Sequence, residues 1–318
     1  MDSRRKFFEQ IVTAGLLLGL KRAALLAAED IYLERPLSGR PHIGKVLAAI
    51  QPHSDDVPLL SAGTVAKLIQ EGYTGHLIRA TNDDMGDAPG LGTPGTVGDH
   101  VLGNQKDNAE VARALGLNRV FDLNYSNHRL SGIQQTELQC RLIFLFRLLK
   151  VDTVFCYDPW AHDEENPDHY VLGHCVEAAC WMAGRPHDYP EQLAAGLQVH
   201  TVKEKYYYAR RPEITRVVDI SGFVDKKVEA NRMNRAKGPA GEKGSQLKAE
   251  LAKRGQRLPL LDGDNLAADR AYIKEFILNR DRELGKKYGV EYAEAFHYIG
   301  TQPSRMDEYL RQNLVPIR

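Results

Sequence analysis

From residue 44 onward, short apolar runs alternate with longer stretches of helical periodicity, and this alternation constrains the fold more than any other feature of the chain. Residues 45–51 (KVLAAIQ) are typical of a buried strand, and residues 59–71 have the periodicity of a helix that ends before Gly72. A repeated strand–helix order predicts βαβ units, because parallel strands need a crossover between them. The sequence therefore predicts an α/β fold, with a Rossmann-like, mostly parallel sheet flanked by helices.

The same alternation continues along the chain. Further strands are expected at residues 76–81, 119–123, 153–157, 202–210 and 216–220, and further helices at residues 105–115, 135–149, 170–183 and 223–235. Residues 238–318 are charged, and we expect a helical C-terminal extension there. The predicted organisation is one domain over residues 43–237, with the extension packed on it.

Charge and composition limit the classes of partner. The chain has 318 residues, 43% of them hydrophobic, and its 42 Lys and Arg residues balance its 42 Asp and Glu residues. A net charge of zero gives no electrostatic footprint for nucleic acid or an anionic membrane surface. The four cysteines have no CxxC spacing, so we expect them in the core. We therefore expect the partner to be a small molecule and not a nucleic acid. The sequence is compatible with an oligomer.

The first 30 residues have the pattern of an export signal. Arg4 and Arg5 precede an apolar run, residues 11–20, that is too short to span a bilayer but matches a signal h-region. A twin-arginine signal over residues 1–30 predicts an exported protein, periplasmic or extracellular, that is not integral to the membrane. The alternative is an amphipathic first helix. Unchanged localisation after replacement of both arginines by lysine would contradict the twin-arginine signal.

Polar clusters follow two of the expected strands, at the place where open α/β sheets bind ligands. The first strand leads into residues 52–56 (PHSDD), and a later βα loop ends in residues 166–169 (NPDH). His53 and Asp56, three residues apart at a strand-to-helix turn, can converge on one ion, and His169 can supply a third ligand. Two imidazoles and a carboxylate with an open position are typical of a hydrolytic zinc site.

The pair of adjacent carboxylates also favours a bound cation. Asp55 and Asp56 would repel each other, and a divalent cation together with the following helix N-terminus relieves that cost. An HxDD stretch alone can equally be a helix cap beside a surface histidine. The second acidic-histidine cluster favours the metal site, in which one carboxylate binds the ion and the other stays free as a base.

These two clusters resemble the signatures of a known family. Residues 52–56 resemble the (P)HPDD signature of the PIG-L/LmbE-like deacetylases, and residues 166–169 resemble their HPDH signature. The resemblance extends over about residues 43–235. Its weaker matches are Ala80-Thr81-Asn82, Leu115-Gly116, Asn124-Tyr125-Ser126-Asn127 and Val218-Asp219-Ile220.

The resemblance implies a zinc-dependent N-deacetylase, a hydrolase of linear amide bonds. It implies that His53, Asp56 and His169 hold zinc or another divalent transition metal. It also implies that Asp55 is the general base for the attacking water, and that Asp168 orients a neighbouring side chain. The implied substrate is an N-acylated, most often N-acetylated, amino sugar or glycoconjugate.

Several residues depart from the family pattern. Asn166 replaces a histidine assigned to oxyanion stabilisation or proton delivery, and Asn cannot shuttle a proton near neutral pH. Either Asp55 returns its own proton to the amine, or another group such as His162 does so, although His162 could simply be a solvent-exposed loop residue. On the substrate side, Asn104 stands where many members have Arg, and Asn127 where they have Asp.

These departures keep two other functions open. One is an amidohydrolase that acts on a non-sugar acyl amine, since charge is lost at two positions on the substrate side. The other is a catalytically silent envelope protein that binds metal or ligand. The Gly-rich stretch over residues 83–103 has no GxGxxG between a strand and a helix, so we interpret it as a mobile rim over the site.

Overall fold

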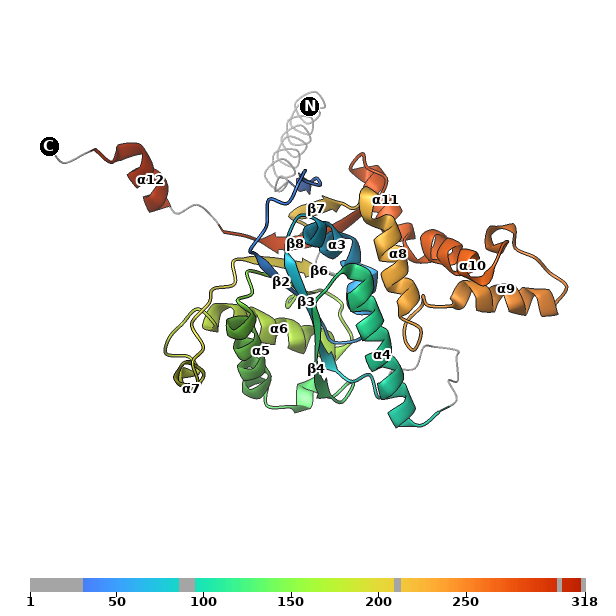
Figure 1. Ribbon diagram of the computed structural model, residues 1–318, viewed down its shortest axis with the longest axis horizontal. Coiled ribbons are helices and arrows are strands. Elements are labelled where there is room, and N and C mark those ends of the chain that lie inside the picture. The colour runs from blue at the N-terminus through green and yellow to red at the C-terminus, as the bar shows by residue number, and fades with distance from the viewer. Residues whose placement is uncertain (1–30, 86–94, 209–212, 302–304, 316–318) are drawn as a thin grey trace, which may run out of the picture.

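In the computed structural model, one sheet of eight strands organises the described residues, which are 31–85, 95–208, 213–301 and 305–315 (Figure 1). The strands are β1 (Tyr32–Glu34), β2 (Val46–Gln51), β3 (Thr74–Thr81), β4 (Arg119–Tyr125), β5 (Thr153–Tyr157), β6 (Glu204–Tyr208), β7 (Arg216–Asp219) and β8 (Ala293–Ile299). Their order across the sheet is β1-β7-β8-β6-β5-β2-β3-β4. Strand β8 runs antiparallel to β6 and β7, and the other neighbours pair in parallel. The predicted mostly parallel α/β fold is confirmed.

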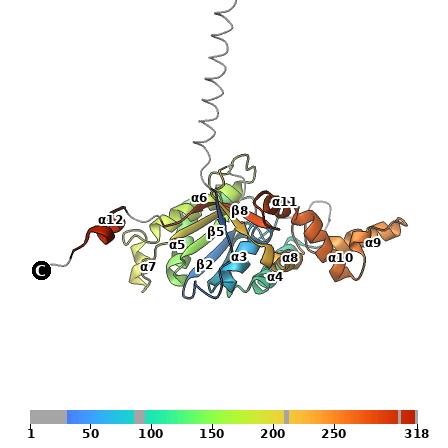
Figure 2. The ribbon, with the colours of Figure 1, turned by 90° about the horizontal axis from the view of Figure 1, so that it is seen from above.

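Helices cover both faces of this sheet (Figures 1 and 2). One face carries α2 (Asp56–Leu60), α3 (Ala62–Gln70), α4 (Val97–Leu115) and α8 (Val224–Met233), and the other carries α5 (Gln135–Leu149) and α6 (Pro167–Met182). The remaining described α-helices are α7 (Pro190–Ala194), α9 (Lys243–Lys253), α10 (Asn265–Tyr272), α11 (Asn279–Lys287) and α12 (Arg305–Asn313). Helices α9 and α10 pack together and project beyond the sheet in both views.

Strand β2 lies at the centre of the core. Leu47 and Ala49 pack with the α3 and α4 side, whereas Ala48 and Ile50 pack with the α5 and α6 side. All four are fully buried, because successive side chains point to opposite faces and helices cover both. This explains why the strand is a continuous apolar run in the sequence.

Two predicted helices differ from the observed ones. The expected helix at residues 59–71 is two helices, α2 and α3, which are separated at Ser61, where φ is −145°. Helix α4 begins at Val97 instead of residue 105. There Thr96 and Asp99 form a capping box in which each side chain accepts a hydrogen bond from the other residue's backbone N–H.

The expectation of a purely helical C-terminal extension is corrected. After α11 the chain returns to the sheet as β8, which lies between β6 and β7. The strand contains a charged residue, Glu294, which interrupts the apolar pattern in the sequence. It is nevertheless buried, because its carboxylate accepts hydrogen bonds from the backbone N–H groups of Gly63 and Thr64 and from Lys227 Nζ. The C-terminal segment is thus part of the central sheet.

Two predicted features lie partly or wholly outside the described residues. These are the export signal at residues 1–30 and the middle of the Gly-rich loop, residues 86–94. Among the helices that the structure describes, none is both long and apolar enough to span a membrane. Three of the four cysteines are buried as expected, whereas Cys140 is half-buried, and all four are free thiols.

Candidate metal centre

The turn after β2 brings the first polar cluster to the carboxyl end of the sheet. The chain passes from Gln51 into a short turn, and Asp56 is the first residue of α2. Thr81 Oγ1 on the neighbouring strand donates a hydrogen bond of 2.7 Å to the carbonyl of Pro52. The His53 amide donates to Asp56 Oδ2 at 2.8 Å, so the Asp56 carboxylate is directed back toward His53.

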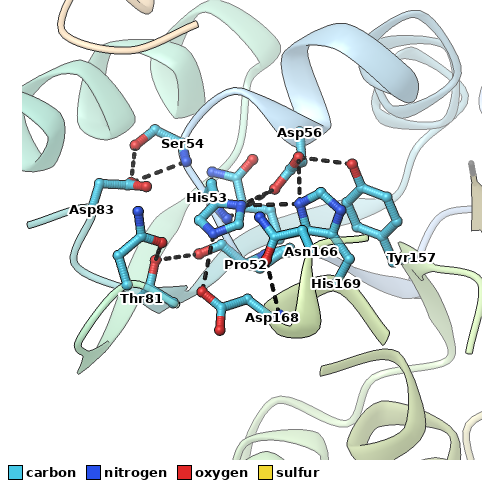
Figure 3. Close-up of polar contacts among 12 residues, drawn as sticks. Pro52, His53, Ser54, Asp56, Thr81, Asp83, Tyr157, Asn166, Asp168 and His169 are labelled. Carbon is cyan, nitrogen blue, oxygen red and sulfur yellow. Dashed lines mark hydrogen bonds and ion pairs between the residues drawn. The ribbon is translucent and has the colours of Figure 1, made fainter. Parts of the chain in front are cut away.

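The start of α6 supplies the second cluster. Asn166 is the N-cap of this helix, and its Oδ1 accepts a hydrogen bond of 3.0 Å from the Asp168 amide. Pro167 occupies the first turn, where its missing N–H costs nothing. Asp168 and His169 therefore lie in the first helical turn, and both face the end of β2 (Figure 3).

Ligand atoms of His53, Asp56 and His169 lie within 4.8 Å of one another, and we call these three residues the candidate metal centre (Figure 3). His53 Nδ1 is 3.1 Å from His169 Nε2 and 3.5 Å from Asp56 Oδ2, and His169 Nε2 is 3.8 Å from Asp56 Oδ1. In a tetrahedral zinc site with bonds of about 2.0–2.2 Å, ligand atoms are roughly 3.4 Å apart. The spacing and the donor types thus fit a divalent metal, and the structure brings the predicted ligand set together.

A carboxylate oxygen lies within ion-pair distance of the second nitrogen of each imidazole. Asp168 Oδ2 is 3.2 Å from His53 Nε2, and Glu164 Oε1 is 3.0 Å from His169 Nδ1. Such pairs fix the tautomer and the ring orientation of a metal-binding histidine. The expectation that Asp168 orients a neighbouring side chain agrees with this contact. Glu164 was not predicted, because its sequence neighbours give no sign that it faces His169.

Tyr157, the last residue of β5, was also not predicted. Its hydroxyl donates a hydrogen bond of 3.0 Å to Asp56 Oδ1, and its ring stacks on that of His169 with 3.9 Å between centres. Burial raises the pKa of the Tyr157 hydroxyl well above its usual value, so the group remains a donor. In the sequence this residue cannot be distinguished from an apolar strand residue.

The charges at the candidate metal centre favour a bound cation. Burial lowers the pKa of His53, but its hydrogen bonds with Asp168 and Asp56 outweigh burial and raise the pKa to about 9. Burial raises the pKa of Asp56, whereas the charges of His169 and His53 lower it, to about 2. The imidazoles are thus surrounded by anions, which attract either a proton or a metal ion.

Asp55 lies beside the candidate metal centre without belonging to it. Its side chain does not cap α2, and burial followed by the charge of Asp56 raises its pKa to about 6. The loop after α8 packs against it: a Cβ built on Gly238, where φ is 85°, would lie 2.9 Å from Asp55 Oδ2. The adjacent Lys237 donates from Nζ to Asp83 Oδ1 at 2.6 Å. A carboxyl in this environment can act as a base near neutral pH.

The other predicted residues lie at varying distances from this centre. Asn104 is buried, with its Oδ1 3.0 Å from Ser54 Oγ and its Nδ2 donating to the carbonyl of His100. Asn127 is also buried, and its Oδ1 lies 3.5 Å from Thr81 Oγ1. Both predicted substrate-binding residues are thus covered by protein in this structure. His162 is exposed on the loop before α6 and lies outside the group of three.

One histidine that sequence reasoning missed lies close to the site. The ring centre of His128 is 6.1 Å from that of His53, and its backbone N–H donates to Asp168 Oδ2 at 2.6 Å. Its position directly after the resemblance at residues 124–127 is the only sequence signal that could have indicated it.

Comparison with known proteins supports the resemblance. Residues 48–180, which include both signature clusters, match the family model PIG-L, described as GlcNAc-PI de-N-acetylase. A diacetylchitobiose deacetylase from Thermococcus kodakarensis is 28% identical over 220 residues, which cover 68% of this chain and 78% of the relative.

Solved structures share the fold. The N,N'-diacetylchitobiose deacetylase from Pyrococcus horikoshii, in complex with an inhibitor, has a TM-score of 0.64 and 23% identity, covering 80% of this chain and 84% of that one. The 4-carboxy-2-hydroxymuconate hydratase from Pseudomonas putida has a TM-score of 0.59 and 16% identity, covering 82% and 98%. Since one neighbour is a hydratase, the fold alone does not determine the reaction. The match to the family model shows that residues 48–180 of this chain are similar to a PIG-L family domain.

Proposed function

We propose that this protein is a metal-dependent hydrolase that removes an N-acetyl group from an amino sugar or a related glycoconjugate. The observation that carries the proposal is the convergence of His53, Asp56 and His169 beside the carboxyl of Asp55. The match to the family model and the relative named diacetylchitobiose deacetylase support the acetyl group and the sugar class.

The candidate metal centre would hold zinc or another divalent transition metal. When bound, such an ion supplies Lewis acidity, which lowers the pKa of water and polarises a carbonyl. The protein contributes orientation: Asp168 contacts the His53 ring, the Tyr157 ring stacks on that of His169, and the Tyr157 hydroxyl donates to the Asp56 carboxylate. His and Asp are ligands that zinc commonly takes. The same ligands also bind iron, cobalt and manganese.

Asp55 handles the proton in this proposal. Its carboxylate takes a proton from the attacking water as the new C–O bond forms at the amide carbonyl. The C–N bond then breaks, and Asp55 returns the proton to the nitrogen of the leaving amine, so that acetate and amine are the products. Asn166 cannot deliver this proton. Its side-chain oxygen caps α6 instead, which positions Asp168 and His169.

The experiment that tests the proposal couples metal content to amine release. The full chain, loaded with Zn²⁺, is assayed on N-acetylglucosamine, N,N'-diacetylchitobiose and the non-sugar N-acetylethanolamine. Wild type should hold about one metal ion per chain and release amine from a sugar substrate. H53A should lose both the metal and the activity, whereas H187A, at an exposed histidine, should keep both.

The outcomes separate the alternatives. Metal binding without amine release from any of the three compounds would contradict the hydrolase and favour a binding protein. Release from N-acetylethanolamine alone would contradict the sugar class but not the reaction. Unchanged metal content in H53A would contradict the assignment of the metal site.

A further inference from the structure

His128 occupies a backbone conformation that favours glycine. Its φ of 59° lies in the left-handed region, where a Cβ is disfavoured. The turn is fixed by Asp168, which accepts hydrogen bonds from the amides of His128 at 2.6 Å and Leu130 at 3.1 Å. Both bonds join the Asp168 carboxylate to backbone N–H groups of the turn, so a glycine at position 128 would make them without strain. The turn itself therefore does not need the imidazole.

The side chain lies next to the candidate metal centre and remains open to solvent. Its ring centre is 6.1 Å from that of His53, the planes meet at 70°, and the residue is exposed. The other sides of the His53 ring are occupied by His169 and Asp168, at 3.1 Å and 3.2 Å from its nitrogens. His128 is thus an exposed imidazole beside a residue of the candidate metal centre.

The proposed reaction needs a hydrogen-bond donor beside the candidate metal centre. The carbonyl oxygen of the amide gains negative charge as water attacks, and a fixed N–H or O–H stabilises it. Asp55, Asp56 and Asp168 accept hydrogen bonds when ionised but donate none. The Tyr157 hydroxyl already donates to Asp56. An imidazole always carries at least one N–H, so this role requires no change in its protonation.

We propose that His128 contacts the substrate and donates a hydrogen bond from its ring to the oxygen of the scissile N-acetyl group. The inference rests on the proposed deacetylase function. Strained residues that the surrounding structure holds in place are common at functional sites. Here the two hydrogen bonds to Asp168 hold the turn that contains the strained residue.

The test compares two glycine substitutions at left-handed positions. H128G removes both the strain and the ring. K150G is the matched control, because Lys150 has φ of 56° at the exposed C-cap of α5, before β5 and therefore at the opposite end of the sheet. Each variant should raise the unfolding midpoint by about 1–3 °C.

Only H128G should lose activity on N,N'-diacetylchitobiose. We expect its kcat/KM to fall by about 10²-fold, mainly through kcat, because the bond strengthens in the transition state. H128N should retain part of the activity, since Asn tolerates this conformation and carries an N–H donor. Zinc content should stay at the wild-type value in all three variants.

Wild-type kcat/KM in H128G would overturn the inference and leave the deacetylase function intact. Loss of zinc together with activity in both H128G and H128N would also overturn it, because the role would then be structural. A wild-type protein that cleaves none of the acetylated compounds would overturn the proposed function, and this inference with it.

Discussion

The candidate metal centre and a second buried cluster, formed by Lys227, Asp281 and Glu294, differ in how their carboxylates are neutralised. In the second cluster the Lys227 ammonium is fully buried, 2.6 Å from Asp281 Oδ2 and 2.7 Å from Glu294 Oε1. That cation belongs to the chain. At the candidate metal centre the ion-pair partners of Asp56 are imidazoles, which are cationic only while they carry an extra proton.

This difference separates a structural role from a chemical one. An ammonium held by two carboxylates cannot be exchanged, so the cluster ties α8, α11 and β8 together. Imidazoles can give up a proton to make room for a metal ion, and the hydrogen bond of 3.1 Å between their two nitrogens would then be replaced by bonds to the ion. A buried acidic cluster therefore indicates a ligand site when the cations that neutralise it are groups, such as imidazolium, that can lose their proton.

The largest expected effect concerns the carboxyl beside the candidate metal centre. D55N should lower kcat on an N-acetylated sugar by about 10²–10⁴-fold, because the amide cannot take the proton of the attacking water. Zinc content should not change, since Asp55 is not among the three ligands. The variant should be at least as stable as wild type, because Asp56 loses a like-charged neighbour. Amine release and metal analysis measure these outcomes.

The control for this variant is D262N, an exposed aspartate paired with Arg257 in the C-terminal segment, which should keep full activity. If D55N retained more than a tenth of the wild-type kcat, the general base would have to be another residue. If D55N lost zinc, Asp55 would be a ligand, and the division of roles between the two adjacent aspartates would be wrong.

The second effect tests the structural cluster. K227M replaces the ammonium with an apolar side chain of similar length and leaves two carboxylates buried without a cation. The free energy of unfolding should fall by about 3–5 kcal/mol. Denaturant titration measures it, and K226M, at the exposed neighbouring residue, should change it by less than about 0.5 kcal/mol. Activity per folded molecule and zinc content should stay at wild-type values in K227M. If K227M stayed stable but lost activity, the cluster around Lys227 would have a chemical role and not the structural role assigned to it.

The sequence was most informative where local pattern and structure agree. Helix α5 and strand β5 have the predicted bounds, 135–149 and 153–157, because an amphipathic helix and a buried strand each have a clear period. The convergence of His53, Asp56 and His169 was also predictable. All three follow parallel strands, whose carboxyl ends meet at one edge of the sheet.

What the sequence could not predict depends on distant partners. Strand β8 carries Glu294, and only the fold shows that donors from α3 and Lys227 on α8 compensate this charge. Tyr157 and Glu164 hold ligands through side-chain directions that no local pattern encodes. In the sequence His128 is one histidine of a predicted loop. Its proximity to His53 follows from how the turn after β4 packs.

The smallest expected effect is a pH dependence within the structural cluster. Glu294 accepts hydrogen bonds from two backbone N–H groups, from Thr64 Oγ1 and from Lys227. Asp281 has the ammonium as its partner, and burial, together with the charge of Glu294, raises its pKa to about 6 from 3.8. Because the folded pKa is the higher one, the stability that Asp281 contributes is complete below its unfolded pKa and is lost as the pH rises through about 6.

Wild type should therefore lose stability relative to D281N between about pH 4 and pH 7, by roughly 1–3 kcal/mol. Denaturant titrations of both proteins at several pH values measure the difference, in which the other titrating groups cancel. A difference that is flat with pH, or one that favours wild type as the pH rises, would mean that Lys227 neutralises both carboxylates equally. Neither carboxylate of this cluster would then take up a proton in this pH range, and the Lys227 ammonium alone would neutralise them, unlike the imidazoles of the candidate metal centre.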